Sequence, residues 1–413
     1  MVTIGALFFI FGFVTWLNGP LITFVKLAFN LDDVNAFLVP MAFYLSYFFF
    51  ALPTSALLRR TGLKNGMAVG LLTMALGAAI FGHFTTMRQY PGALTGLFTI
   101  GGGLSILQTA ANPYISVLGP IESAAQRIAV MGISNKLAGV LAPIVFGALV
   151  LDGLDHLDAR VRATPDEQAR DALLTTFAAK VYVPYMLMAG LLALLAIWIA
   201  RSRLPEITGE TLGGTTERVS HDRRSALAFP HLLLGVMCLF LYVGVEVLAG
   251  DAIGTYAAGF GLTPAQTRFF TSYTLAAMLV GYVAGFLLIP RFISQEIYLA
   301  VSAVFGVLLT LAAYATSGAI SIVFIASLGF ANAMMWPAIF PLAIRGLGRH
   351  TETGSALLIM AIAGGALLPY AYALLKQHIN FQTAYVLIAV PSYLFICAYG
   401  MAGCRAGDTA RRS

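Results

Sequence analysis

Long uninterrupted apolar runs alternate along this chain with short segments that carry charge, proline or glycine. A run of about 20 apolar residues is long enough to cross the hydrocarbon core of a bilayer as an α-helix. The runs are too long for tilted barrel strands and lack an alternating pattern, so each is predicted to be a helix. The twelve predicted spans are 3–27, 35–58, 66–86, 92–117, 128–151, 181–201, 230–257, 267–289, 297–315, 320–344, 354–375 and 383–404.

The composition supports an all-α integral membrane protein. Apolar residues make up 59% of the 413 residues and charged residues only 10%, whereas soluble domains carry about 25% charged residues. A soluble fold could not hide this much apolar surface. The predicted partner is therefore a lipid bilayer. The net charge of +6 does not indicate nucleic acid, because Lys and Arg concentrate in the cytoplasmic loops of membrane proteins.

Two longer polar segments interrupt the series of spans. Residues 152–180 are charged and predicted to be partly helical, whereas residues 202–229 are polar and lie between spans six and seven. We therefore predict an N-terminal half (residues 1–201), a cytoplasmic linker (202–229), a C-terminal half (230–404) and a cytoplasmic tail (405–413). Each half is expected to be a six-helix bundle, with a central site between the two.

The distribution of basic residues predicts the orientation. With both termini in the cytoplasm, fifteen of the 24 Lys and Arg residues fall in inner loops and eight in outer loops, while Lys136 lies inside a span. Because inner loops are enriched in Lys and Arg, we expect a multi-pass protein of the plasma membrane (the bacterial inner membrane) with both termini cytoplasmic. We expect it to be a monomer.

Polar residues inside the spans are the candidates for function. Such residues are costly in a membrane unless they face water, a partner or a substrate. They are Asn18, Gln108, Asn112, Asn135, Lys136, Glu246, Asp251 and Asn332. Counted along their helices, Lys136 and Gln108 lie near the bilayer midplane. Asp251 lies near the outer end of span seven, unless the glycines around it let that span break.

The amides suggest a sugar site. Sugar hydroxyls both donate and accept hydrogen bonds, and amide side chains do both without a charge. Gln108 and Asn112 are four residues apart and share one helical face. Trp16 and Trp336 could lie against the flat face of a pyranose ring. The alternative for Asn112, which precedes Pro113, is a helix kink with a satisfied amide.

The charged residues suggest coupling to a cation. A carboxylate in a low-dielectric cleft can bind and release a proton, or hold a cation, which makes Glu246 and Asp251, with Lys136, candidates. The alternatives are a structural Lys–Glu pair that locks the two halves together and, for Asp251, a solvated residue at a helix end. The sequence shows no metal-ligand spacing among its six histidines and no catalytic motif, so no enzyme, metal or organic cofactor is predicted.

Two stretches resemble a known family. Residues 8–18 (FFIFGFVTWLN), and residues 107–114 (LQTAANPY) followed by 118–120 (LGP), resemble the fucose–galactose–glucose proton symporters of the major facilitator superfamily. The resemblance implies two six-helix bundles that rock around a central sugar, and a sugar-contacting role for Asn135. The most similar members are those assigned to glucose, galactose or N-acetylglucosamine uptake.

The chain departs from that family at two positions. Fucose symporters have an Asp directly after the Leu-Asn pair of span one and a Glu before the Thr-Ala-Ala-Asn-Pro of span four. Here these positions are Gly19 and Gln108, which cannot titrate. We therefore predict uptake of a hexose or N-acetylhexosamine, coupled to a proton or sodium ion through Glu246 or Asp251. The alternatives are an uncoupled sugar facilitator and a carrier for another small polar solute.

Overall fold

The computed structural model describes residues 2–117, 124–152, 157, 160–161, 163–202, 229–289, 292–347 and 350–407. All regular structure among these residues is helical. Twelve helical segments are long and apolar enough to cross a membrane, which confirms the twelve predicted spans. Most of the linker and of the tail lies outside the described residues, so their boundaries remain predictions.

The helices follow one another with short connections. Those of the N-terminal half are α1 (Val2–Thr15), α2 (Asn18–Ala28), α3 (Asp33–Ala36), α4 (Leu38–Thr86), α5 (Tyr90–Val117), α6 (Ala124–Leu149), α8 (Glu167–Ala179) and α9 (Tyr182–Arg201). Those of the C-terminal half are α11 (Pro230–Gly250), α12 (Ile253–Ala258), α13 (Pro264–Thr267), α14 (Phe270–Leu288), α15 (Gln295–Ala315), α16 (Gly318–Asn332), α17 (Met335–Ile344), α18 (Thr351–Met360), η4 (Ala361–Ala363), α19 (Gly364–Leu375), α20 (Phe381–Met401) and η5 (Gly403–Arg405). Helix α8 confirms the partly helical segment predicted within residues 152–180.

Several spans are broken into two helices. Span one breaks between α1 and α2, span seven between α11 and α12, and span ten between α16 and α17. The break in span seven falls at Asp251, beside Gly250. In carriers, broken helices surround the substrate site, because the backbone groups freed at a break need polar partners.

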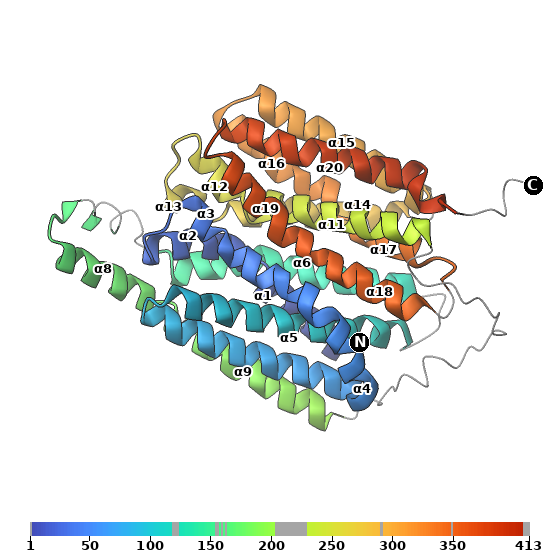
Figure 1. Ribbon diagram of the computed structural model, residues 1–413, viewed down its shortest axis with the longest axis horizontal. Helices are drawn as coiled ribbons and strands as arrows, with labels where there is room; N and C mark the ends of the chain where they lie inside the picture. Colours follow the sequence, from blue (N-terminus) through green and yellow to red (C-terminus); the bar gives the residue numbers. More distant parts are fainter. Residues whose placement is uncertain are drawn as a thin grey trace, which may run out of the picture.

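The helices lie side by side along the long axis of the molecule, with those before residue 202 on one side and most of those after 229 on the other (Figure 1). Within the N-terminal half α4 packs against α5 and α9, and within the C-terminal half α15 packs against α16 and α20. The halves meet along two seams, where α6 packs on α14 and where α4 packs on α18, η4 and α19.

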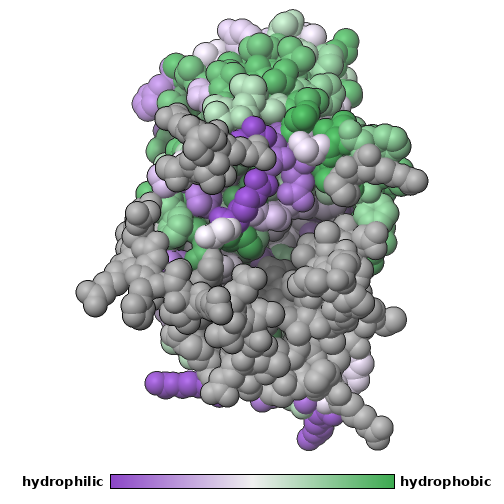
Figure 2. All heavy atoms as spheres, turned by 90° about the vertical axis from the view of Figure 1, so that its right-hand side faces the viewer, coloured by the Kyte–Doolittle hydropathy of each residue, from purple (hydrophilic) through white to green (hydrophobic). Residues whose placement is uncertain are grey.

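The outer surface is apolar where it would face lipid. On α9, Val183, Leu187, Leu191 and Leu194 repeat every three or four residues and are all more than half exposed. In water such a stripe would be an aggregation hazard, but in a bilayer it is the contact with acyl chains. Figure 2 looks onto the end of the molecule at which α1 begins and shows hydrophilic residues gathered near the middle of the described surface.

Glycines set the closest approaches between helices. A Cβ atom added to Gly329 of α16 would lie 2.0 Å from the carbonyl oxygen of Thr274 on α14. In the same way, a Cβ on Gly12 of α1 would lie 2.1 Å from the carbonyl oxygen of Asn135 on α6. Small residues at such positions let membrane helices pack backbone to backbone.

We expect Gly329→Ala to lower the free energy of unfolding by about 1–3 kcal/mol, because the new methyl group meets a backbone atom that cannot turn aside. The measurement is thermal unfolding of the purified protein in detergent. Gly190→Ala on α9 is the matched control, since no atom lies within 4 Å of its new Cβ and alanine favours a helix. Equal melting temperatures for the two variants would contradict the close contact.

Candidate substrate and coupling site

An ion pair crosses the interface between the two halves. Lys136 comes from α6 in the N-terminal half and Glu246 from α11 in the C-terminal half, and the Lys136 Nζ lies 2.9 Å from the Glu246 Oε1. Both side chains are about nine-tenths buried. This geometry is that of the structural Lys–Glu pair that the sequence analysis gave as an alternative to a coupling role. The two residues are 110 positions apart in the sequence.

Aromatic rings enclose the Lys136 ammonium. Its Nζ lies 4.5 Å from the centre of the Trp16 ring and 5.8 Å from the centre of the Tyr282 ring. A cation over an aromatic face is attracted by the negative face of the ring. Trp16, predicted to contact a sugar, is buried at the break in span one and also packs against Gly250 of α11. In this conformation Lys136 therefore covers one face of the tryptophan.

Asp251 is the second carboxylate at the interface. It lies at the break between α11 and α12 and is 2% exposed, which excludes a solvated position at a helix end. Its Oδ2 accepts a hydrogen bond from the Tyr44 hydroxyl of α4 at 3.5 Å, whereas its Oδ1 has no hydrogen-bond partner. The interface thus buries two carboxylates but, among the described residues, only the Lys136 cation beside them.

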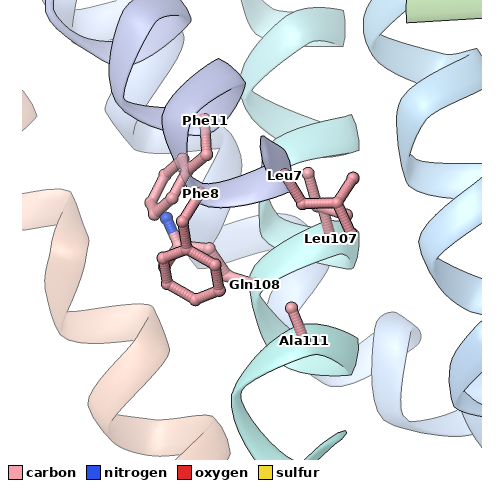
Figure 3. A pocket seen from close by; sticks show the side chains of 6 residues that line it. All are labelled: Leu7, Phe8, Phe11, Leu107, Gln108 and Ala111. Carbon is pink, nitrogen blue, oxygen red and sulfur yellow. The ribbon is translucent and has the colours of Figure 1, made fainter. Parts of the chain in front are cut away.

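Two of the predicted amides lie in the N-terminal half near the interface. The Gln108 Nε2 donates to the Tyr47 hydroxyl at 3.0 Å, and the Asn135 Nδ2 donates to the Phe8 carbonyl at 3.5 Å. Each residue is less than a tenth exposed. Gln108 extends from α5 toward the rings of Phe8 and Phe11 on α1 (Figure 3).

Gln108 borders a very small cavity, with a volume of about 10 Å³. It is lined by Leu7, Phe8, Phe11, Leu107, Gln108 and Ala111, all from α1 and α5. The cavity thus belongs to one half and is smaller than the roughly 300–1,000 Å³ typical of ligand pockets. A site for a hexose would have to form when the halves move apart.

The other predicted site residues lie apart from this cluster or support it. Asn18 begins α2, and its Nδ2 donates to the Thr15 carbonyl across the break in span one. Asn332 is buried in the C-terminal half, where its Oδ1 accepts from the Tyr393 hydroxyl at 2.9 Å and its Nδ2 has no partner. Trp336 is half-buried on α17 and stacks on Phe340. The side chain of Asn112 lies outside the described residues.

Three tyrosines that the sequence analysis missed contact the polar cluster: Tyr44 bonds Asp251, Tyr47 bonds Gln108, and Tyr282 lies over Lys136. They were missed because a search for polar residues in apolar spans counts tyrosine as apolar. A signal was available, since Tyr44 and Tyr47 are three residues apart on one face of a predicted helix.

A cluster of ion pairs around Asp33 lies at the end of the molecule away from the start of α1, and one of these pairs joins the halves. The Asp33 carboxylate of α3 accepts hydrogen bonds from Lys26 of α2 and from Lys376, the residue directly after α19. Both nitrogen–oxygen distances are 2.5 Å. Because Lys376 belongs to the C-terminal half, its pair with Asp33 ties the two halves together at the end where α3 and the end of α19 lie (Figure 1). Opening it requires that the Asp33–Lys376 pair break.

Comparisons with known proteins agree with this architecture. Residues 4–369 match the family described as Major Facilitator Superfamily. A "Glucose/galactose transporter" of Brucella abortus is 33% identical over 98% of this chain and 93% of its own length. An "L-fucose-proton symporter" of Escherichia coli strain K12 is 29% identical over 88% of this chain and 83% of its own length.

The fold also matches a solved structure. A crystal structure titled as a Major Facilitator Superfamily transporter, FucP, in the outward conformation has a TM-score of 0.75 and 26% sequence identity. The match covers 97% of this chain and 98% of that one. It confirms the predicted fold of twelve helices in two six-helix bundles.

We expect Glu246→Gln to destabilise the protein by about 3–5 kcal/mol, because it leaves the buried Lys136 ammonium without its counter-ion. The double variant Lys136→Met/Glu246→Gln should recover most of this loss, since neither buried charge remains. Thermal unfolding of the two single variants and the double variant measures the coupling. Additive losses would show that the pair does not interact in the folded protein.

Proposed function

Because this chain belongs to the major facilitator superfamily, we propose that it takes up a hexose or an N-acetylhexosamine across the membrane by alternating access. The family is one of transporters, so the chain is a multi-pass membrane transporter and not an enzyme. The observation that carries the proposal is the set of buried polar residues near the interface: the Lys136–Glu246 pair, Asn135 next to Lys136 on α6, and Gln108, which is bonded to Tyr47 of α4.

The chemistry of this cluster suits a sugar. Gln108 and Asn135 each offer a donor and an acceptor without a charge, and Trp16 and Tyr282 supply aromatic faces nearby. The names of the relatives, glucose/galactose transporter and L-fucose-proton symporter, support a hexose. We propose a substrate like glucose, galactose or N-acetylglucosamine, because each presents several ring hydroxyls that amide side chains can both donate to and accept from. Asn112, Asn332 and Trp336 are proposed to complete the site when it opens.

Alternating access follows from how the halves are held together. The Asp33–Lys376 pair closes one end, and the Lys136–Glu246 pair ties the centre. A sugar that entered between the halves would separate the central pair and offer hydroxyls to its charges, so that neither charge is left unpaired. We propose that the carrier is a monomer of the bacterial inner membrane with both termini in the cytoplasm.

We propose that uptake is driven by a cation gradient, proton or sodium, because the interface buries more carboxylates than cations. The second candidate is an uncoupled facilitator. Gly19 and Gln108 favour it, since the fucose symporters that this chain resembles carry titratable side chains at those two positions.

Uptake into proteoliposomes tests the function. We expect saturable counterflow of radiolabelled glucose, galactose or N-acetylglucosamine, and accumulation only when a proton or sodium gradient is imposed. Fucose completes the panel, and liposomes without protein are the control. Absence of counterflow with every sugar would contradict sugar transport, whereas counterflow without gradient-driven accumulation would favour the facilitator.

We expect Gln108→Ala and Asn135→Ala each to weaken sugar binding by about tenfold or more, because each removes hydrogen bonds that cost about 1–3 kcal/mol to leave unmade. The measurement is equilibrium sugar binding to protein purified in detergent. Gln168→Ala is the matched control, since Gln168 is an exposed amide on α8. Wild-type affinity in both site variants would remove the proposed sugar site.

A further inference from the structure

We propose that Asp251 is the residue that carries the coupling ion, that this ion is a proton, and that Glu246 does not serve this purpose. The inference rests on the proposed function, which leaves the ion and its carrier open. It begins from the unequal surroundings of the two carboxylates that α11 brings to the interface. One has a cation in direct contact, and the other has none.

The negative charge of Glu246 is already balanced by a cation in contact with it. Its Oε1 lies 2.9 Å from the Lys136 ammonium, and the same ammonium is held by the rings of Trp16 and Tyr282. Removing the charge of Glu246 would leave that buried cation without a counter-ion, which is strongly unfavourable. While the halves are closed, the pair is therefore stable only as two opposite charges in contact.

Asp251 lacks such a partner. The groups that face it are the Tyr44 hydroxyl from α4, Gly19 from α2, and the Thr271 hydroxyl from α14, with Glu246 and Lys136 as the charged residues near enough to act on it. The Thr271 hydroxyl donates elsewhere, to the Gly250 carbonyl at 2.9 Å. Lys136, the one cation among these neighbours, is bonded to Glu246.

A buried carboxylate in these surroundings favours the neutral, protonated form. Burying an ionised carboxylate without a counter-ion is far more costly than burying a neutral one. The Asp251 Oδ1 is buried with no hydrogen-bond partner. The groups that favour the ionised form are the dipoles of the Tyr44 hydroxyl and the Gly19 backbone, and the Lys136 cation that is already bonded to Glu246. A sodium ion would need several oxygen ligands, and the one other carboxylate among the neighbours of Asp251 is Glu246, which is bonded to Lys136.

The position of Asp251 ties its protonation to the movement of the halves. It belongs to the C-terminal half, yet two of its neighbours, Tyr44 and Gly19, belong to the N-terminal half. A Cβ on Gly19 would lie 3.2 Å from the Asp251 Oδ1 and 2.4 Å from the Thr271 Oγ1, so the missing side chain is what lets the two helices close over the carboxyl. When the halves part, the carboxyl meets water, where the ionised form is stable.

The transport cycle then balances in protons. An Asp251 carboxylate oxygen takes one proton from water on the side of entry. The neutral carboxyl allows the halves to close around the sugar, and it releases the same proton when they reopen on the other side. With sugar bound and Asp251 ionised, closure would bury an unpaired charge, because the sugar engages Lys136, so the sugar does not move without the proton. With no sugar bound, the Lys136 ammonium is near enough to act on Asp251 as well as on Glu246, so it offsets the ionised carboxylate and the empty carrier returns without a proton.

The test compares Asp251→Asn with the wild type in proteoliposomes. Asparagine keeps the shape of the protonated acid but cannot ionise. We expect wild-type protein to accumulate sugar under a proton gradient, to raise the external pH when sugar is added, and to exchange sugar more slowly as the pH rises. The variant should show counterflow that no longer depends on pH, no pH change, and no accumulation. Glu167→Gln, on the exposed first turn of α8, should behave as wild type.

Each other outcome is decisive. Gradient-driven accumulation by Asp251→Asn, or wild-type accumulation driven by sodium and not by protons, would overturn the inference. Loss of counterflow in both Asp251→Asn and Asp251→Ser would also overturn it, because Asp251 would then be needed for sugar binding or for folding. Wild-type protein without counterflow for any sugar would contradict the proposed function instead, so the two failures are distinguishable.

Discussion

The buried ion pair between Lys136 and Glu246 is the interaction on which the rest of the site depends. It joins one helix of each half at 2.9 Å, away from water. In such a medium an ion pair is stable only while both partners stay together, since either charge alone is costly. Any motion that separates the halves must therefore supply new partners to both charges. The hydroxyl groups of a substrate can act as these new partners. The free energy of closing the halves therefore differs between a carrier with a polar solute bound and an empty one.

The unequal number of charges adds a second constraint. Glu246 and Asp251 are five residues apart on span seven, and both reach toward the N-terminal half, but the described residues place only Lys136 beside them. The break in span seven at Asp251 turns the second carboxyl toward Tyr44 and Gly19. In an unbroken helix Asp251 would lie about 7.5 Å further along the helix axis than Glu246, and its carboxyl would not be turned by the break. The break in span seven thus lies between Glu246, which forms an ion pair, and Asp251, which has no counter-ion in contact.

Much of the fold could be predicted from the sequence, because an apolar run of sufficient length in a bilayer has one stable conformation. The twelve spans, and the placement of apolar residues within them and polar residues between them, follow from that rule. The breaks in spans one and ten were not predicted. Breaks depend on which neighbour satisfies the freed backbone groups, as Asn18 does for the Thr15 carbonyl, and a linear pattern does not contain neighbours. The tyrosines were missed for a different reason, because a search for polar residues in apolar spans counts tyrosine as apolar.

The sequence by itself determined the class of protein, the spans, and a short set of polar residues that a membrane would not tolerate without a purpose. Its resemblance to the fucose symporters implies in addition that Gly19 and Gln108 stand at positions where those proteins have acids. Only the tertiary structure decided that Glu246 contacts Lys136 and that Asp251 lies beside Gly19. The physical reason is that an apolar run encodes its own burial locally, whereas the partner of a buried charge comes from a distant segment and is chosen by the packing of the two halves.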